Sequence, residues 1–270
     1  MLLACPLCQD LLSPAEQGLS CANGHRFDRA RQGYFNLLPV QHKKSRAPGD
    51  NPQMVEARRH FLAAGHYAPL AQGLVERAQT LNPKRWLDIG CGEGYYTAAI
   101  ANALPQADGH ALDISRDAVK RACRLAPEVA WLVASMARVP MPSASCDLLL
   151  SVFSPLDYAE AIRLLAPGGH LLRLGPTSEH LLELREKIYD EVRPYDDAKH
   201  LTDLPAQLTL TDSGQLSFEL TLNNPADRAN LLAMTPHGWR ASEAKRQAVI
   251  AEPLVVRVAV RYDVLQRLPE

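Results

Sequence analysis

The stretch Leu87-Asp88-Ile89-Gly90-Cys91-Gly92-Glu93-Gly94 decides the fold of this 270-residue chain. It follows a short apolar run that predicts a β-strand, and it precedes a pattern typical of a helix. Its three glycines can adopt positive φ angles and let the backbone approach a ligand closely. Asp113 ends the next expected strand, about 20 residues further on, where an acid can hydrogen-bond the hydroxyls of a ribose. The Gly-x-x-Gly ending of NAD-binding turns is absent, which disfavours that class, while a turn without a ligand stays open.

Outward from this loop, apolar strands alternate with helices. Continuous apolar runs such as Leu148-Leu149-Leu150 are typical of strands buried on both faces. The alternation therefore predicts an α/β fold with a parallel sheet covered by helices on both sides. Ser115 is placed to cap the second helix. The expected strands are 85–89, 109–113, 129–134, 146–153 and 169–174, and the expected helices are 96–104, 117–125 and 159–165.

The alternation stops after about residue 176. Asp212-Ser213-Gly214 lies between two segments of period-two alternation and is the expected turn of an antiparallel hairpin. Asn224-Pro225 predicts a cap and a first-turn proline at the start of a helix. The expected elements of this part are a helix at 179–192, the hairpin at 208–222, a helix at 225–234 and a last sheet strand at 254–262.

Two pairs of metal-binding side chains lie near the N-terminus. Cys5-Pro6-Leu7-Cys8 and Cys21-Ala22-Asn23-Gly24-His25 each bring two ligands to a tight turn, with twelve residues between Cys8 and Cys21. Sulfur and nitrogen ligands in this number suit a tetrahedral, structural zinc ion. A module of this size cannot build a sufficient core, so the metal must contribute to its folding. Chance clustering, or a disulfide with a spare cysteine and histidine, is the alternative.

The segment from Asn23 to Arg46 is basic, although the whole chain has a formal net charge of −1. Phe27, Tyr34 and Phe35 are interleaved with its cations. Such a segment could follow a phosphate backbone while its aromatic rings stack on bases. A solvated rim, with the rings packed under the zinc turns, is the alternative. The segment contains one acid, Asp28. Its cations are Arg26, Arg29, Arg31, Lys43, Lys44 and Arg46.

Composition sets outer limits on the class of protein. Apolar residues make up 47% of the chain, enough for a full α/β domain and a small appendage. No apolar run approaches the ~20 residues that cross a bilayer, and the N-terminus does not resemble a signal peptide. Three of the six cysteines lie in the first 21 residues, which favours a metal site in a reducing compartment over a disulfide framework. We therefore expect a cytoplasmic protein without membrane contact.

The loop Asp88–Gly94 resembles the first motif of class I methyltransferases, which bind S-adenosylmethionine, and Leu165–Leu171 resembles the turn into that class's fifth strand. The resemblance implies a Rossmann-like, mostly parallel sheet of seven strands, here with a small N-terminal zinc ribbon. The glycine loop would lie under the methionine part of the donor, and Asp113 would hold its ribose. The expected parts are a zinc ribbon (1–36), a basic linker and helix (37–66) and a methyltransferase domain (67–270) with substrate-side elements at about 176–250.

Nearly the whole chain then resembles one family, the 23S ribosomal RNA guanine-N1 methyltransferases. The resemblance implies methylation of N1 of a guanine in a hairpin loop of 23S ribosomal RNA. The family's donor-binding positions would fall on Tyr67, Gly92, Glu93 and His180, beside Asp88, Gly90, Gly94 and Asp113 of the class motif. The segments that carry the resemblance are the Cys5/Cys8/Cys21/His25 ribbon, Gly33–Arg46, Pro48–Asp50, Ala57–Arg59, Phe61-Leu62, Gly65–Tyr67, Gly92–Thr97, Met234–Pro236 and Trp239-Arg240.

The acceptor side is less well defined by the sequence. Ser151-Val152-Phe153-Ser154-Pro155 ends the fourth expected strand and lacks the Asn/Asp-Pro-Pro-aromatic tetrad of enzymes that methylate exocyclic amines. Cys146 lies at the wrong end of that strand for a nucleophile and is expected in the core. Guanine N1 carries a proton that must be removed, and the candidates for the catalytic base are His180, Asp157 and water.

Two other functions stay open. The chain could methylate a small molecule, such as a quinone-like metabolite, with the ribbon as a structural lid or dimer contact. It could also be a binding module that has lost its activity. The basic segment favours RNA over a small molecule, and the intact glycines with Asp113 argue against lost activity. The sequence is compatible with a homodimer but does not fix the oligomeric state.

Overall fold

The structure is a computed structural model that describes residues 2–39 and 49–269. None of its helices is long and apolar enough, over these residues, to cross a membrane. The strands are β1 (Ser13–Ala15), β2 (Gly18–Ser20), β3 (Arg26–Asp28), β4 (Phe35–Asn36), β5 (Arg85–Ile89), β6 (Asp108–Asp113), β7 (Ala130–Val133), β8 (Cys146–Val152), β9 (Leu165–Pro176), β10 (Leu208–Leu222) and β11 (Leu254–Arg267). The helices are α1 (Pro52–Ala63), α2 (Ala68–Leu81), α3 (Tyr95–Ala103), α4 (Arg116–Ala122), α5 (Tyr158–Leu164), α6 (Leu182–Ile188), α7 (Pro225–Met234), α8 (Pro236–Arg240) and α9 (Glu243–Ala251).

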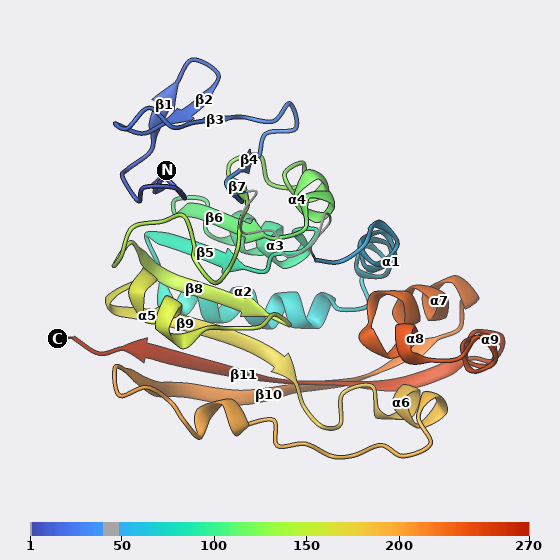
Figure 1. The fold of residues 1–270 in the computed structure, drawn as a ribbon. Coiled ribbons are helices and arrows are strands. Elements are labelled where there is room, and N and C mark those ends of the chain that lie inside the picture. The colour runs from blue at the N-terminus through green and yellow to red at the C-terminus, as the bar shows by residue number, and fades with distance from the viewer. Residues whose placement is uncertain (1, 40–48, 270) are drawn as a thin grey trace.

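A mixed sheet forms the centre of the molecule, and strands β1–β3 form a small separate sheet above it (Figure 1). The order of the large sheet is β10-β11-β9-β8-β5-β6-β7-β4. Neighbours from β9 to β4 are parallel, and β11 is antiparallel to both β9 and β10. The predicted α/β class with a mostly parallel sheet is confirmed.

The two faces of the sheet are covered differently. Helices α2, α3 and α4 pack on one face of the sheet. Their side chains Leu70, Ile100 and Val119 belong to the same hydrophobic core as alternate residues of the strands. On the other face, α5 shares the cover with the N-terminal ribbon, whose Leu3 and Leu19 belong to the second core. At the carboxyl ends of the parallel strands, α1 packs against α7, with α8 and α9 beside them (Figure 1).

The sheet has eight strands because β4 adds one to the seven that were expected. Phe35 and Asn36 pair in parallel with Leu132 and Val133 of β7. A strand of two residues has no alternation to detect, and its pairing depends on where the ribbon docks. The backbone N–H of Ala4 also donates to the carbonyl of Pro140 at 2.9 Å, which ties the start of the ribbon to the larger domain.

Local signals for helix starts are confirmed. The Ser115 hydroxyl accepts a hydrogen bond from the N–H of Ala118, and the Asn224 side chain accepts one from Ala226, so both residues cap the helices that follow. The helix expected at 179–192 is shorter, because α6 begins only after Leu181, whose φ is 52°. An interior helical residue cannot adopt that angle.

The turn predicted at Asp212-Ser213-Gly214 is wrong. Strand β10 runs through these residues, which pair with Val264, Asp263 and Tyr262 of β11. The register shifts between Leu210 and Asp212, so the turn-forming residues accompany a β-bulge. Gly214 is required for another reason: a Cβ there would lie 2.7 Å from the Tyr262 hydroxyl, in a ring held 3.5 Å below the Arg77 guanidinium.

Substitution Gly214→Ala tests this arrangement. The added methyl group would push against the Tyr262 ring, and overpacking of this kind costs about 1–3 kcal/mol. Urea unfolding should show that loss in the free energy of unfolding. Ser213→Ala, at an exposed neighbouring position, should stay within about 0.5 kcal/mol of the parent. Equal stability of both variants would contradict the close approach of Gly214 to the Tyr262 ring.

Candidate functional site

The glycine loop between β5 and α3 has the conformation that its sequence predicts. Gly90, Gly92 and Gly94 have φ angles of 79°, 56° and 87°, which residues with a Cβ rarely adopt. Space is limited as well: a Cβ on Gly94 would lie 2.8 Å from both Ala122 and Trp131. The loop therefore needs glycine to pass close to α4.

Asp113 lies beside the loop because β5 and β6 are parallel neighbours that end at the same edge. Its carboxylate accepts one hydrogen bond from the N–H of Gly92 at 3.0 Å and another from the N–H of Ser115 at 2.7 Å. It therefore joins the loop to the start of α4. Each carboxylate oxygen still has a second lone pair for a ligand hydroxyl.

Two more acids of the loop are almost fully buried. Asp88, 2% exposed, accepts a hydrogen bond from the Thr97 hydroxyl at 2.6 Å, and its other oxygen has no hydrogen-bond partner among the described residues. Glu93 is 4% exposed. Burial raises the pKa of each to about 7, and it raises the pKa of Asp113 as well. Buried acids of this kind favour a positively charged ligand.

Arg58 is a site residue that the sequence did not indicate, although the segment Ala57–Arg59 carries part of the family resemblance. It extends from α1 to the loop, where its Nη2 lies 2.6 Å from the Asp50 carboxylate and its Nη1 lies 3.7 Å from Glu93. The site thus combines one guanidinium with four acids: Asp50, Asp88, Glu93 and Asp113. The sequence signal is weak because α1 precedes the loop by some thirty residues and only the folded chain brings the two together.

An aromatic cluster, defined by Tyr67, Tyr96, Phe153 and His180, stands next to the loop. The Phe153 ring centre lies 6.4 Å from those of Tyr67 and Tyr96 and 5.8 Å from that of His180. The buried hydroxyls of Tyr67 and Tyr96 have no hydrogen-bond partner among the residues that the structure describes. Together with the free oxygen of Asp88, they are the orphaned polar atoms that a bound polar ligand would satisfy.

His180 and Asp157, the two candidates for the catalytic base, have defined local partners. The N–H of Ala259 donates to Nδ1 of His180 at 3.3 Å. Burial lowers the pKa of His180 to about 4, so the ring is neutral near pH 7 with its proton on Nε2. Asp157 is exposed and accepts hydrogen bonds from the N–H groups of Ala159 and Glu160, which makes it the cap of α5.

The four predicted metal ligands converge. The ligand atoms of Cys5, Cys8, Cys21 and His25 all lie within 4.8 Å of one another. The Sγ atoms of Cys8 and Cys21 are 3.6 Å apart, close to the ~3.7 Å edge of a tetrahedron with zinc–sulfur bonds of about 2.3 Å. Gly24 has a φ of 80° and completes the turn between Cys21 and His25. The donor set therefore fits a structural zinc ion with no open position.

The aromatic residues of the basic segment do not form an RNA-stacking surface. Tyr34 and Phe35 are buried, and the Tyr34 hydroxyl accepts a hydrogen bond from Arg116. Phe27 packs partly against the second core. The cations Arg26, Arg29 and Arg31 are exposed on the ribbon. Lys43, Lys44 and Arg46 lie outside the described residues.

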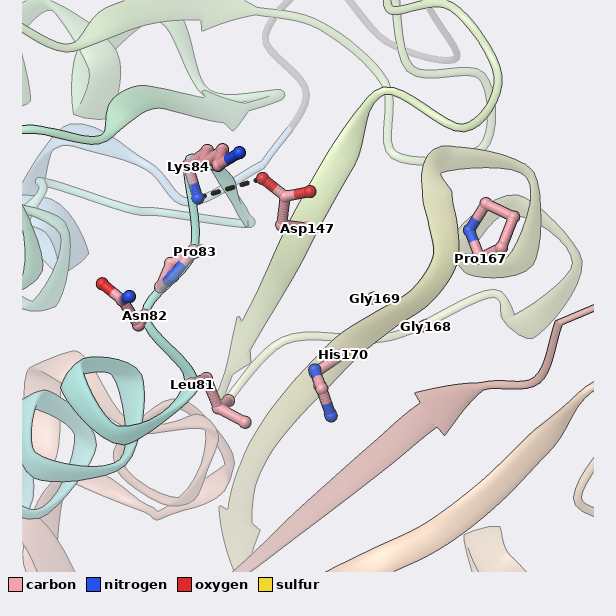
Figure 2. Close-up of a pocket in the computed structure, with 9 residues that line it drawn as sticks. All are labelled: Leu81, Asn82, Pro83, Lys84, Asp147, Pro167, Gly168, Gly169 and His170. Carbon is pink, nitrogen blue, oxygen red and sulfur yellow. Dashed lines mark hydrogen bonds between the residues drawn. The ribbon is translucent and has the colours of Figure 1, made fainter.

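A cavity of about 300 Å³, whose lining residues Figure 2 shows, is present in the structure. It lies at the opposite edge of the sheet from the glycine loop. It is formed by the residues before β5 and the starts of β8 and β9. Asp147, its one acidic lining residue, accepts hydrogen bonds from the backbone N–H groups of Lys84 and Arg85. Ligands of open α/β sheets bind at the carboxyl ends of the strands, so this cavity is not the donor site.

Comparison with known proteins agrees with this geometry. The RlmA N-terminal zinc-ribbon family matches residues 3–46, and a methyltransferase domain family matches residues 87–169. The YcgJ protein of Bacillus subtilis, a solved structure, superimposes with a TM-score of 0.51 at 17% identity over 74% of this chain and 98% of that one, which supports the fold alone. Fold, glycine loop and domain match define a class I methyltransferase that uses S-adenosylmethionine and carries a zinc ribbon.

Full-length relatives identify the family. The 23S rRNA (guanine(748)-N(1))-methyltransferase of Streptomyces fradiae is 33% identical over 99% of this chain and 97% of its own length. A protein of Micromonospora griseorubida, provisionally named a 23S rRNA (guanine-N(1)-)-methyltransferase, is 35% identical over 96% of this chain and 95% of its own. The chain belongs to the RlmA family of 23S rRNA (guanine-N1)-methyltransferases.

Substitution Cys21→Ser should remove zinc and destabilise the whole protein. The ribbon's Leu3 and Leu19 share a core with Leu112 and Leu132 of the large sheet, so loss of the metal also disturbs the sheet. Metal analysis and calorimetry should show loss of zinc and one transition lowered by several degrees. Asp113→Ala should keep its zinc. A separate ribbon transition beside an unchanged main one would show that the ribbon folds independently.

Proposed function

We propose that this protein transfers the methyl group of S-adenosylmethionine to N1 of a guanine in 23S ribosomal RNA. The observation that carries the proposal is the match of zinc ribbon and methyltransferase domain together, over nearly the full length of relatives with that name. A small-molecule methyltransferase with a ribbon as lid is less well supported, because the ribbon packs on the face of the sheet that α5 leaves uncovered rather than over the donor loop. Cys91, Cys123 and Cys146, the cysteines outside the zinc set, are free thiols, which is in keeping with work in the cytoplasm.

We infer that the donor lies over Gly90, Gly92 and Gly94. Asp113 would take the ribose hydroxyls with its remaining lone pairs, while Asp88 and Glu93 would favour the positive charges of the methionine part. Arg58 is the one cation that the described residues bring to the site, and it would face the methionine carboxylate. Tyr67 would cover the donor from the start of α2, where its buried hydroxyl lacks a partner among the described residues.

When bound, S-adenosylmethionine supplies a methyl group on a positively charged sulfur, so the protein mainly has to align the guanine with that methyl group. The N1 proton must leave as the new bond forms. Nδ1 of His180 already accepts the N–H of Ala259, and the Asp157 carboxylate caps α5. We therefore infer that water takes the proton. His180 would donate from Nε2 to guanine O6, which gains negative charge as N1 is deprotonated.

The affinity for S-adenosylmethionine should fall between pH 8 and pH 6. Asp88 and Glu93 have a pKa of about 7 in the free protein, and only their ionised forms attract the sulfonium and ammonium groups. Each acid that must ionise weakens binding by up to about tenfold at pH 6. Calorimetry across this range measures the effect. S-adenosylhomocysteine, which lacks the sulfonium charge, should respond less, and a flat profile for the methyl donor would contradict these roles.

Methyl transfer to RNA tests the proposed function directly. Purified 23S rRNA from a strain lacking the gene is incubated with radiolabelled S-adenosylmethionine, and the nucleosides are then identified by mass spectrometry. We expect 1-methylguanosine at one site. Asp157→Asn should keep the rate because asparagine also caps a helix. No incorporation, with turnover on a quinone-like metabolite instead, would overturn the proposal.

A further inference from the structure

Phe153 is the most unusual residue at the edge of the sheet where the donor loop lies. It directly follows β8, its φ is 52°, and its side chain is 40% exposed. A left-handed conformation is uncommon for a bulky residue, and such strain gathers at functional sites. An exposed apolar ring does not contribute enough stability to offset this backbone strain. The stability of the fold alone therefore does not explain this residue.

The backbone around Phe153 is held on both sides. Its N–H donates to the carbonyl of Leu174 in β9 at 2.9 Å. The hydroxyl of Ser154 donates to the carbonyl of Ile89 at 2.7 Å, directly before the glycine loop. The Ser154 Cβ would lie 2.6 Å from a Cβ on Gly90. The backbone of Phe153 is thus held next to the donor loop before any ligand arrives.

The order of the strands assigns the two sides of the loop to different ligands. Strand β5 carries the loop and lies between β6 and β8. Asp113, the acid suited to a ribose, ends β6, whereas Phe153 follows β8 on the other side. The donor's nucleoside would therefore extend toward β6, which leaves the space over β8 for the acceptor.

The neighbours of Phe153 leave its outer surface available. Tyr67, 3% exposed, is buried behind the ring, while Tyr96 and His180 are partly buried. Phe153 is the most exposed of the four rings and so leaves part of an apolar ring accessible to a ligand next to the donor loop. A planar aromatic group is the ligand that such a surface fits best.

We propose that Phe153 is the stacking platform for the target guanine. The inference rests on the proposed function and names the residue that receives the base once it has left its RNA stack. Stacked there, the guanine would present N1 toward the glycine loop, with O6 near His180. The strained backbone then has a purpose, because it places the ring at the end of β8, on the acceptor side of the donor loop.

The test compares Phe153→Leu, which keeps apolar bulk but loses the flat face, with Phe153→Tyr, which keeps the face. Initial rates are measured on 23S rRNA from the deletion strain, with donor affinity by calorimetry and RNA affinity by filter binding. Leu125→Ala, at an exposed apolar position after α4, is the matched surface control. Melting temperatures are recorded for all variants.

We expect Phe153→Leu to lower kcat about tenfold or more, in the range that loss of one base–aromatic stack produces. RNA affinity should change little because phosphate contacts dominate it, and donor affinity should stay within about twofold. Phe153→Tyr and Leu125→Ala should retain most of the parent rate.

Three results would overturn the inference: an unchanged rate for Phe153→Leu, an equal loss for Phe153→Tyr, or a loss of donor affinity that matches the loss of rate. The last result would mean that the ring covers the donor or supports the fold. Failure of the parent protein to make 1-methylguanosine would instead refute the proposed function, so the two outcomes are distinct.

Discussion

The structure depends on one backbone constraint, the passage of three glycines with positive φ between β5 and α3. Because these residues have no Cβ, α4 and Ser154 can approach the loop from its two sides. Asp113 then accepts the Gly92 N–H, and Ser154 donates to the carbonyl of Ile89. The proposed contacts of the donor and of the acceptor base are all positioned relative to this loop. Its shape therefore fixes the geometry of the whole site.

Features that arise from neighbouring residues could be predicted from the sequence. The glycine loop, the caps Ser115 and Asn224, and the convergence of the four metal ligands all follow from short-range spacing, and the structure agrees with each. The prediction of a turn at Asp212-Ser213-Gly214 was wrong because it, too, rested only on short-range sequence signals. Local propensity there is that of a turn, but pairing with fourteen residues of β11 outweighs it.

Features that need long-range contacts were not predictable. Arg58 reaches the loop from a helix that precedes it, and no periodic pattern indicates this. Phe153 appears in the sequence as an ordinary aromatic residue, and only its backbone angle and neighbours make it unusual. The burial of Tyr34 and Phe35 likewise depends on how the ribbon docks, which decided between two interpretations that the sequence had left open.

The short strand β4 reduces the tendency of the sheet to pair with other chains. It covers β7, which would otherwise be the outer strand on that side of the sheet. An uncovered parallel strand presents free N–H and C=O groups to any other chain that can pair with them. The N-terminal segment thus protects the protein from edge-to-edge aggregation. A version that lacks residues 1–36 would lose this protection together with the metal ligands.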